Sequence, residues 1–412
     1  MKIVQIATSV VGGAGVAAKR LNDALNNVGV NSTLIYIKVD KDVRQPNISI
    51  FERSQVESFT SKALTFAQQK IVQSGDDLVT LFSVSTLNLD KIFKLEPDIV
   101  HVHSFYNLLN TKDIEKLVNS GISIFITLHD ERILTGGCHC TNGCNNFHSK
   151  CERCPQSRIL FRSAITKEKF NWLHIFENEN HITLICPSKW MAGQVKKAGL
   201  NPSIHSEIIR NPISSMYLDL KISDRDKETR SPFIVTFISQ DLRNSYKGLQ
   251  NILECISIYS SELNRNNIFF RFVGNGPKLK IEGVQYRQYP NLSEGDLIEI
   301  YKSTDLLLVP SKTDNSPNVI FEAAMCGTPF LGSNKAGLPE LSELFGFSSF
   351  EYGNSESLYN AIVEAKNAVT NSLKIRNLAF ENVDPQTIAE TLKGLYQRKL
   401  IESVSRRSSK DL

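Results

Sequence analysis

Residues 305–340, DLLLVPSKTDNSPNVIFEAAMCGTPFLGSNKAGLPE, read as one strand, one helix and the start of the next strand. The apolar run Leu306–Pro310 predicts a strand, and a polar loop follows it. A helix is expected to begin at Pro317, because Ser316 is a preferred N-cap residue and proline is a preferred first helical residue. Gly327 ends that helix, since glycine readily adopts the left-handed conformation found after helix ends. This alternation is typical of parallel sheets covered by helices.

The same alternation runs through almost the whole chain. It predicts an α/β fold of two Rossmann-like parallel-sheet domains, because 412 residues exceed one ordinary core. The carboxyl ends of the strands, where such domains bind ligands, are expected on either side of a central cleft. Strands are predicted at 2–7, 32–37, 98–103, 122–129 and 182–187 in the first half, and at 233–238, 268–274, 306–310 and 329–332 in the second.

Polar stretches mark the expected domain boundaries. The first domain is expected to span residues 1–213 and the second 233–383, with the charged segment 214–232 as a linker. A closing helix is predicted over 384–400, followed by a disordered polar tail at 401–412.

The composition is that of a soluble globular protein, with 41% hydrophobic and 22% charged residues. The 47 basic and 43 acidic residues leave a net charge of +4, which is too small to indicate nucleic-acid binding. That charge is compatible with an anionic small substrate, or with loose contact at the inner face of a membrane. Residues 1–11 have the composition of a short signal segment, but the glycines after them favour a buried first strand. A cytoplasmic protein is therefore expected.

Two acidic residues flank the start of the helix in the opening segment. Glu322 lies four residues after Asn318 on the same helix face, and Asp314 lies just before the helix. The helix start follows a strand's carboxyl end, so it is suited to bind a phosphate group. The carboxylates could each bind a pair of sugar hydroxyls, although a solvated helix face with a capping aspartate would produce the same pattern.

In these residues the chain resembles the retaining glycosyltransferases of family 4, which have the GT-B fold. That family carries two acidic residues eight positions apart, then A-x-x-x-G-x-P and G-x-P-E; here they are Asp314 and Glu322, Ala323–Pro329 and Gly337–Glu340. The resemblance implies that Asp314 contacts the transferred sugar and Glu322 the ribose. Asn318 and Val319, at the start of the helix, are further candidates for donor binding. Asp314 replaces the commoner glutamate, in the wording D-N-x-P-N. Retention without a protein nucleophile is also implied.

Further candidates for donor binding lie after other predicted strands. Gly12 and Gly13 follow the first strand, where glycine allows backbone N–H groups to approach a phosphate or sugar, or simply allows the first helix to pack. In the family, a lysine and a preceding arginine neutralise the pyrophosphate, and Lys247 and Arg243 match them. Each could equally be an ordinary exposed cation.

His129 ends the apolar run from Ile122 and resembles the histidine that family members place beside the donor sugar and the acceptor. The alternative is a buried histidine with a structural hydrogen bond. His101 and His103 alternate along another predicted strand, where packing is the favoured role.

Five of the eight cysteines fall between residues 138 and 154. Cys138, Cys144, Cys151 and Cys154 form C-x5-C-x6-C-x2-C, which favours one structural zinc in a loop without an apolar run of its own. Free thiols or a redox disulfide are the alternatives. This stretch resembles an exopolysaccharide and colanic-acid-type subgroup of the family, and it suggests that the loop shapes the acceptor side.

These observations predict transfer of a sugar from a nucleoside-diphosphate donor to a sugar or lipid-linked glycan acceptor, in surface or exopolysaccharide biosynthesis. No cofactor is expected for catalysis, because no Asp-x-Asp motif is placed to hold a divalent metal. A non-catalytic nucleotide-sugar-binding or scaffold protein and an epimerase of the same fold remain open. A phosphorylase would need a pyridoxal phosphate lysine, and none is evident; a zinc-dependent nucleic-acid binder is disfavoured by the low charge.

Overall fold

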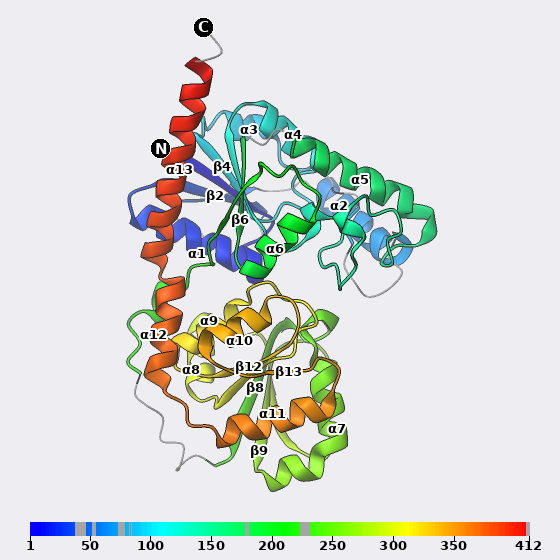
Figure 1. The fold of residues 1–412 in the computed structure, drawn as a ribbon, viewed down its shortest axis with the longest axis vertical. Helices are drawn as coiled ribbons and strands as arrows, with labels where there is room; N and C mark the ends of the chain where they lie inside the picture. The colour runs from blue at the N-terminus through cyan, green and yellow to red at the C-terminus, as the bar shows by residue number, and fades with distance from the viewer. Residues whose placement is uncertain are drawn as a thin grey trace. The chain divides into compact units, whose positions relative to one another are not determined.

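The computed structural model describes residues 1–37, 47–51, 55–72, 79–81, 83, 85–177, 181–222 and 231–408. The chain divides into two compact units (Figure 1). The first comprises Met1–Pro212 together with Pro385–Leu412, and the second comprises Ile213–Asp384. No helix among the described residues is long and apolar enough to cross a membrane.

The first unit is built on a seven-stranded sheet with the order β3-β2-β1-β4-β5-β6-β7, in which all neighbouring strands are parallel. Its strands are β1 (Lys2–Ala7), β2 (Asn31–Ile37), β3 (Ile48–Phe51), β4 (Ile99–Val102), β5 (Ser123–Thr127), β6 (Ile182–Cys186) and β7 (His205–Ile208). Its α-helices are α1 (Gly13–Asn27), α2 (Gln55–Ala67), α3 (Leu89–Phe93), α4 (Thr111–Asn119), α5 (Arg162–Ile175), α6 (Lys189–Lys197) and α13 (Pro385–Ser408).

The second unit is built on a six-stranded parallel sheet with the order β10-β9-β8-β11-β12-β13. Its strands are β8 (Phe233–Asp241), β9 (Ile268–Asn275), β10 (Gln285–Tyr289), β11 (Leu306–Val309), β12 (Phe330–Ser333) and β13 (Ser349–Phe350). Its α-helices are α7 (Leu249–Arg265), α8 (Glu294–Lys302), α9 (Asn318–Met325), α10 (Leu338–Phe345), α11 (Ser355–Asn367) and α12 (Ser372–Val383).

Each unit has its own apolar core. In the first unit, α1 and α13 lie side by side (Figure 1) and bury Leu25, Leu392 and Tyr396 against Phe125 of β5. The Phe125 and Tyr396 rings meet edge to face, with centroids 4.7 Å apart. Helix α13 therefore completes the core of the first unit, although it follows the second unit in the sequence.

The predicted α/β class with two parallel sheets is confirmed, and each of the nine predicted strands is present in the structure. Their ends agree to within two residues, except that β8 continues three residues beyond the predicted end, to Asp241. The predicted tail is wrong in part, because α13 continues through residue 401 to Ser408. The sequence from Lys399 to Ser408 contains no helix-breaking proline or glycine, so the helix continues. Residues 223–230 of the predicted linker and residues 409–412 lie outside the described part of the chain.

Candidate functional site

An ion pair joins two loops at the carboxyl edge of the second sheet. Lys247 follows β8 and Asp314 follows β11, and these strands are neighbours in the sheet. The Lys247 Nζ lies 2.5 Å from Asp314 Oδ2, with the two side chains 35% and 12% exposed. Two residues that were predicted for different parts of a donor are thus in direct contact.

Glycines allow these loops to approach so closely. Gly248 has φ +75°, and a Cβ there would lie 1.8 Å from the Pro310 carbonyl oxygen. Gly337, in the G-x-P-E stretch, donates its N–H to the Asp314 carbonyl at 2.9 Å. A Cβ on Gly337 would lie 1.9 Å from the Asn315 carbonyl oxygen. The motif glycines therefore fix the positions of Lys247 and Asp314 through the backbone.

Helix α9 begins one residue later than predicted. Pro317 is the N-cap residue, with extended backbone angles and no side-chain capping hydrogen bond, so the predicted cap by Ser316 is wrong. The reason is that residue 317 remains extended at ψ 122°, outside the helical range. Asn318 and Val319 form the half-buried first turn. The predicted helix end is confirmed, since Gly327 follows the C-cap residue with φ +70°.

Glu322 lies buried on α9 and already has one protein partner. The Tyr301 hydroxyl, from the end of α8, donates to Glu322 Oε2 at 2.8 Å. Burial and then the negative charge of Glu322 hold the pKa of Tyr301 well above its usual value. Tyr301 was not singled out from the sequence.

Arg243 is placed differently from Lys247. Its guanidinium donates from two nitrogens to the Asp241 carboxylate, at 3.0 and 2.6 Å, and its side chain is 72% exposed. Hydrogen bonds from Arg243 lower the pKa of Asp241. The structure therefore shows an exposed bidentate pair at the end of β8 and does not bring Arg243 into contact with Lys247 or Asp314.

The glycine-rich turn after β1 has a clear packing role. Gly12 is the N-cap residue of α1 with φ +82°, and a Cβ on Gly15 would lie 2.1 Å from the Ser9 carbonyl oxygen. A Cβ on Gly13, by contrast, would meet nothing within 4 Å. The packing explanation thus accounts for Gly15, and the N-cap conformation accounts for Gly12, while a Cβ would have space beside Gly13.

His129 lines a small cavity of about 30 Å³ at the carboxyl ends of β4 and β5. Its Nε2 lies 3.2 Å from Nδ1 of His103, which also lines the cavity. Burial lowers the pKa of His129 to about 4, against the opposing charge of Asp130. His129 is therefore neutral at physiological pH.

A histidine–aspartate pair lines the same cavity. His139 Nδ1 donates to Asp130 Oδ2 at 2.7 Å, and its Nε2 lies 2.8 Å from Thr80 Oγ1. Burial acts to raise the pKa of Asp130, but His139 and the backbone N–H of Arg132 outweigh it, so that pKa is lowered. This hydrogen-bonded pair, next to His129, was not predicted from the sequence.

The four predicted zinc ligands are only partly brought together. Cys138 and Cys154 are buried with their sulfur atoms 3.9 Å apart. The hydrogen bond from Cys138, with backbone N–H groups of Gln156 and Ser157, lowers the pKa of Cys154 to about 7. Within the described residues, no group of three or more His, Cys, Asp or Glu side chains is arranged to hold a metal ion. All eight cysteines are free thiols.

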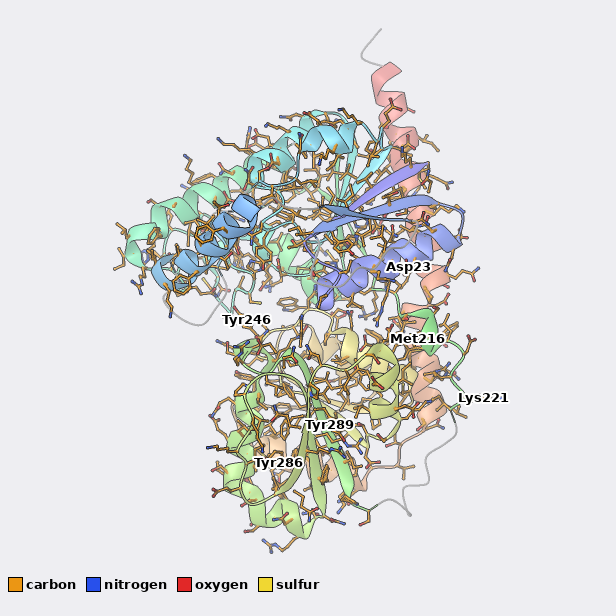
Figure 2. All side chains as sticks on the ribbon, turned by 180° about the vertical axis from the view of Figure 1, so that it is seen from behind. Asp23, Met216, Lys221, Tyr246, Tyr286 and Tyr289 are labelled. Atoms are coloured by element: carbon orange, nitrogen blue, oxygen red, sulfur yellow. The ribbon has the colours of Figure 1, made fainter. Side chains whose placement is uncertain are left out.

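An open depression of about 550 Å³ lies at the carboxyl ends of β9 and β10. Tyr286 and Tyr289 line it, and Figure 2 labels both on the second unit. The Arg287 guanidinium lies 4.8 Å from the centre of the Tyr289 ring. This surface combines cationic and aromatic side chains, and sequence reasoning missed it because β10 was not predicted.

Comparisons with known proteins give a family-model match in the second unit. Residues 232–367, from β8 through α11, match the family model described as "Glycosyl transferases group 1". No curated protein sequence matches the chain significantly.

Solved structures match nearly the full length of the chain. The sucrose-phosphate synthase of Thermosynechococcus elongatus has 13% identity and a TM-score of 0.63, covering 96% of this chain and 98% of its own. An E. coli trehalose-6-phosphate structure bound with UDP-2-fluoro glucose has 12% identity and a TM-score of 0.62, covering 96% and 99%. The catalytic domain of starch synthase IV from Arabidopsis thaliana, bound to ADP and acarbose, has 14% identity and a TM-score of 0.62, covering 97% and 99%. The chain therefore has the GT-B fold.

Proposed function

We propose that this GT-B chain, whose second unit matches the group 1 glycosyl transferases, is a nucleotide-sugar-dependent glycosyltransferase. It takes a sugar from a nucleoside-diphosphate donor and transfers it, with retention of configuration, to a sugar or lipid-linked glycan. The observation that carries the proposal is the contact between Lys247 and Asp314 at the sheet edge that precedes α9.

Binding of a donor would break the ion pair between Lys247 and Asp314. An incoming diphosphate offers oxygens to the Lys247 ammonium, and sugar hydroxyls offer protons to the Asp314 carboxylate. Lys247 thus exchanges a carboxylate for another anion, and Asp314 exchanges the ammonium donor for neutral hydroxyl donors. Because Asp314 is nearly buried, the pair keeps its carboxylate neutralised until the donor arrives.

Departure of the nucleoside diphosphate is the step that these residues assist. Negative charge grows on the diphosphate oxygens as the glycosidic bond breaks, and Lys247 stabilises that charge. The backbone N–H groups at the first turn of α9, around Asn318 and Val319, add the positive end of a helix. Retention follows from attack on the face that the leaving group vacates, so no protein nucleophile is assigned.

Glu322 is proposed to bind the ribose hydroxyls of the nucleotide. The hydrogen bond from Tyr301 occupies Oε2 and fixes the orientation of the carboxylate. A carboxylate has about four lone-pair sites and can accept hydrogen bonds from several donors at once. Bound ADP in the starch synthase IV structure and UDP-2-fluoro glucose in the E. coli structure support a nucleotide ligand for this fold.

The proposed role is in surface or exopolysaccharide synthesis, in the cytoplasm or at the inner face of the membrane. The resemblance of the Cys138–Cys154 loop to the exopolysaccharide-type subgroup supports it. Eight free thiols are in keeping with a reducing compartment. The net charge of +4 supports loose contact with anionic lipids and gives no support to nucleic acid as a partner.

Release of nucleoside diphosphate tests the proposal directly. Purified protein is incubated with a panel of sugar nucleotides and with free or lipid-linked sugar acceptors. Lys247→Ala and Glu322→Ala are each expected to lower the rate at least about a hundredfold, since each removes a charged contact to the donor. Lys302→Ala is the matched control, because Lys302 is also 35% exposed and ion-paired, 2.9 Å from Glu299.

The outcomes also separate the rival functions. Full activity in both site variants would overturn the site assignment. Nucleotide-sugar binding without diphosphate release across the panel would indicate a scaffold protein. A changed nucleotide sugar formed without any acceptor would indicate an epimerase.

We also propose one structural zinc at Cys138, Cys144, Cys151 and Cys154. Two zinc-bound thiolates lie about 3.8 Å apart for zinc–sulfur bonds of about 2.3 Å, close to the 3.9 Å between Cys138 and Cys154. Cys144 and Cys151 would have to move in to complete the set. About one zinc per chain is expected by elemental analysis and about none in Cys138→Ser/Cys154→Ser; less than a tenth of an equivalent in wild-type protein would rule the metal out.

A further inference from the structure

A line of buried polar side chains leads from the interior of the first unit to the cavity at His129. Gln5 lies in β1 and His103 directly follows β4. His103 Nε2 lies 2.8 Å from Gln5 Oε1, and His103 Nδ1 lies 3.2 Å from His129 Nε2. Gln5 is fully buried and His103 nearly so, so these groups must satisfy one another's hydrogen bonds.

One backbone carbonyl sets the direction of every hydrogen bond in this line. The Asn47 carbonyl oxygen can only accept, and Asn22 Nδ2 donates to it at 3.2 Å. Asn22 therefore turns its Oδ1 toward Gln5, whose Nε2 donates to it at 3.2 Å. The same Gln5 nitrogen donates to Ser32 Oγ at 2.8 Å, and Ser32 donates in turn to Asn22. The Gln5 amide oxygen must then face His103.

The two histidines continue the same direction. Because Gln5 Oε1 can only accept, the proton of His103 is on Nε2. Burial, followed by the charges of His101 and His129, holds the pKa of His103 well below its usual range, so Nδ1 carries a lone pair at neutral pH. That lone pair accepts from His129 Nε2–H, which leaves the lone pair of His129 on Nδ1.

The other groups around His129 do not reverse this direction. Asp130 is engaged with His139 and with the N–H of Arg132. His101 stacks on His103 at 4.3 Å and forms its own hydrogen bonds to Tyr396 and Thr127. Among the described residues, no hydrogen-bond partner is found for His129 Nδ1.

We propose that Gln5 and His103 are positioning residues that hold His129 in the Nε2–H form, with Nδ1 as a hydrogen-bond acceptor for a sugar hydroxyl. The chemistry is selective. An unprotonated imidazole nitrogen accepts a hydrogen bond from a hydroxyl, but it has no proton to donate to a phosphate or carboxylate oxygen. The identity of the ligand rests on the proposed glycosyl transfer, whereas the protonation pattern of His129 does not.

Nitrogen NMR of the full chain tests the pattern without any substrate. Histidine-selective ¹⁵N labelling and long-range proton–nitrogen correlation distinguish the two neutral tautomers, and His129→Gln assigns the signal. In wild-type protein, His129 is expected as the Nε2–H tautomer alone near neutral pH. A predominant Nδ1–H signal, or a charged imidazole, would overturn the inference.

Two variants separate the positioning role from general stability. Gln5→Met removes the acceptor for His103, so both His129 tautomers should appear and kcat/KM should fall about tenfold, the size of one lost hydrogen bond. Tyr396→Phe removes a hydroxyl that lies 2.6 Å from His101 Nδ1. This hydrogen bond is equally buried but is not part of the line from Gln5 to His129. The variant should leave the His129 tautomer unchanged; mixed tautomers in Tyr396→Phe, or a single Nε2–H form in Gln5→Met, would contradict the assignment.

Failure of the glycosyl-transfer proposal would show differently. Suppose that no donor releases diphosphate but wild-type His129 is still the Nε2–H tautomer. That result would rule out the proposed glycosyl transfer and would leave the positioning role of Gln5 and His103 supported. The tautomer in wild-type protein also decides the matter if Gln5→Met fails to fold.

Discussion

The hydrogen bond from Tyr301 to Glu322 has consequences for stability as well as for the site. Both side chains are buried, and the acceptor is an ionisable carboxyl group. Removing the hydroxyl leaves that carboxyl oxygen without its donor in a place that water does not reach.

Tyr301→Phe is therefore expected to lower the free energy of unfolding by about 1.5–3 kcal/mol, the range for hydrogen bonds to charged groups. The measurement is urea unfolding followed by circular dichroism. Tyr286→Phe serves as the comparison, because it loses a hydroxyl bond to the Leu279 carbonyl at 2.8 Å in a less buried place. Equal losses in the two variants would argue against a special cost at Glu322.

The neutral histidines predict how stability depends on pH. Burial lowers the pKa of His101 to about 3 and that of His129 to about 4, from 6.5 in an exposed histidine. Between these values the unfolded chain binds more protons than the folded chain. The contribution of these histidines to the free energy of unfolding should thus be fully present above about pH 6.5. It should decrease as the pH falls toward about 4, by up to about 1.4 kcal/mol per pH unit for each histidine.

Unfolding in urea at about pH 7 and about pH 5 measures this slope. His101→Gln should flatten it, whereas His174→Gln should not, because His174 is 67% exposed. A slope unchanged in His101→Gln would mean that other groups cause the pH dependence.

Single residues of the site were only partly predictable. Lys247, Asp314 and Glu322 could be named because motif spacing identifies them, but their mutual contacts could not. Gln5 carried a usable signal, as a polar residue inside the apolar strand Lys2–Ala7, since an interior polar group needs a partner. The contact of Arg243 with Asp241, two residues away, could not be distinguished from a donor contact by sequence alone.

Among the structural elements, the strands that were missed share one property. They are β3, β7, β10 and β13, the four edge strands of the two sheets. An edge strand has one neighbour and is short or partly solvated, so it lacks the long apolar run of a central parallel strand. For example, β10 reads QYRQY and has no fully buried residue.

The loop between β8 and α7 yields a prediction about backbone strain. Gly248→Ala must adopt φ +75° and also contact the Pro310 carbonyl, so it should destabilise the second unit by more than about 2 kcal/mol and weaken donor binding through Lys247. Gly346→Ala has a similar φ of +70° but nothing within 4 Å of the added Cβ. It should cost about 1–2 kcal/mol; equal thermal shifts in the two variants would show that the close approach at Pro310 is not important.

At the scale of the whole molecule, α13 makes the first unit discontinuous in sequence. Leu392, Leu395 and Tyr396 are buried in a core that otherwise comes from residues before 212. The sequence predicted the helix but not its partner, because the helix follows the second unit in the chain and its own residues do not indicate which core they join.

A chain that stops after Asp384 should lose the folded first unit and keep the second. The expected readout is limited proteolysis, with residues 1–212 degraded and a fragment near 213–384 protected. A chain that stops after Ser408 retains all of α13 and is the control. Full protease resistance of the first unit in the shorter chain would show that α13 is dispensable there.

The first and last residues of the second unit lie next to each other, since the Ile213 N–H donates to the Val383 carbonyl at 2.9 Å. During synthesis on the ribosome, the second unit is complete once residue 384 has emerged, whereas the first unit still lacks α13. Domains generally fold as units as they emerge. The part made first is therefore expected to finish folding last, and until α13 arrives it exposes the apolar side chains around Phe125 to chaperones.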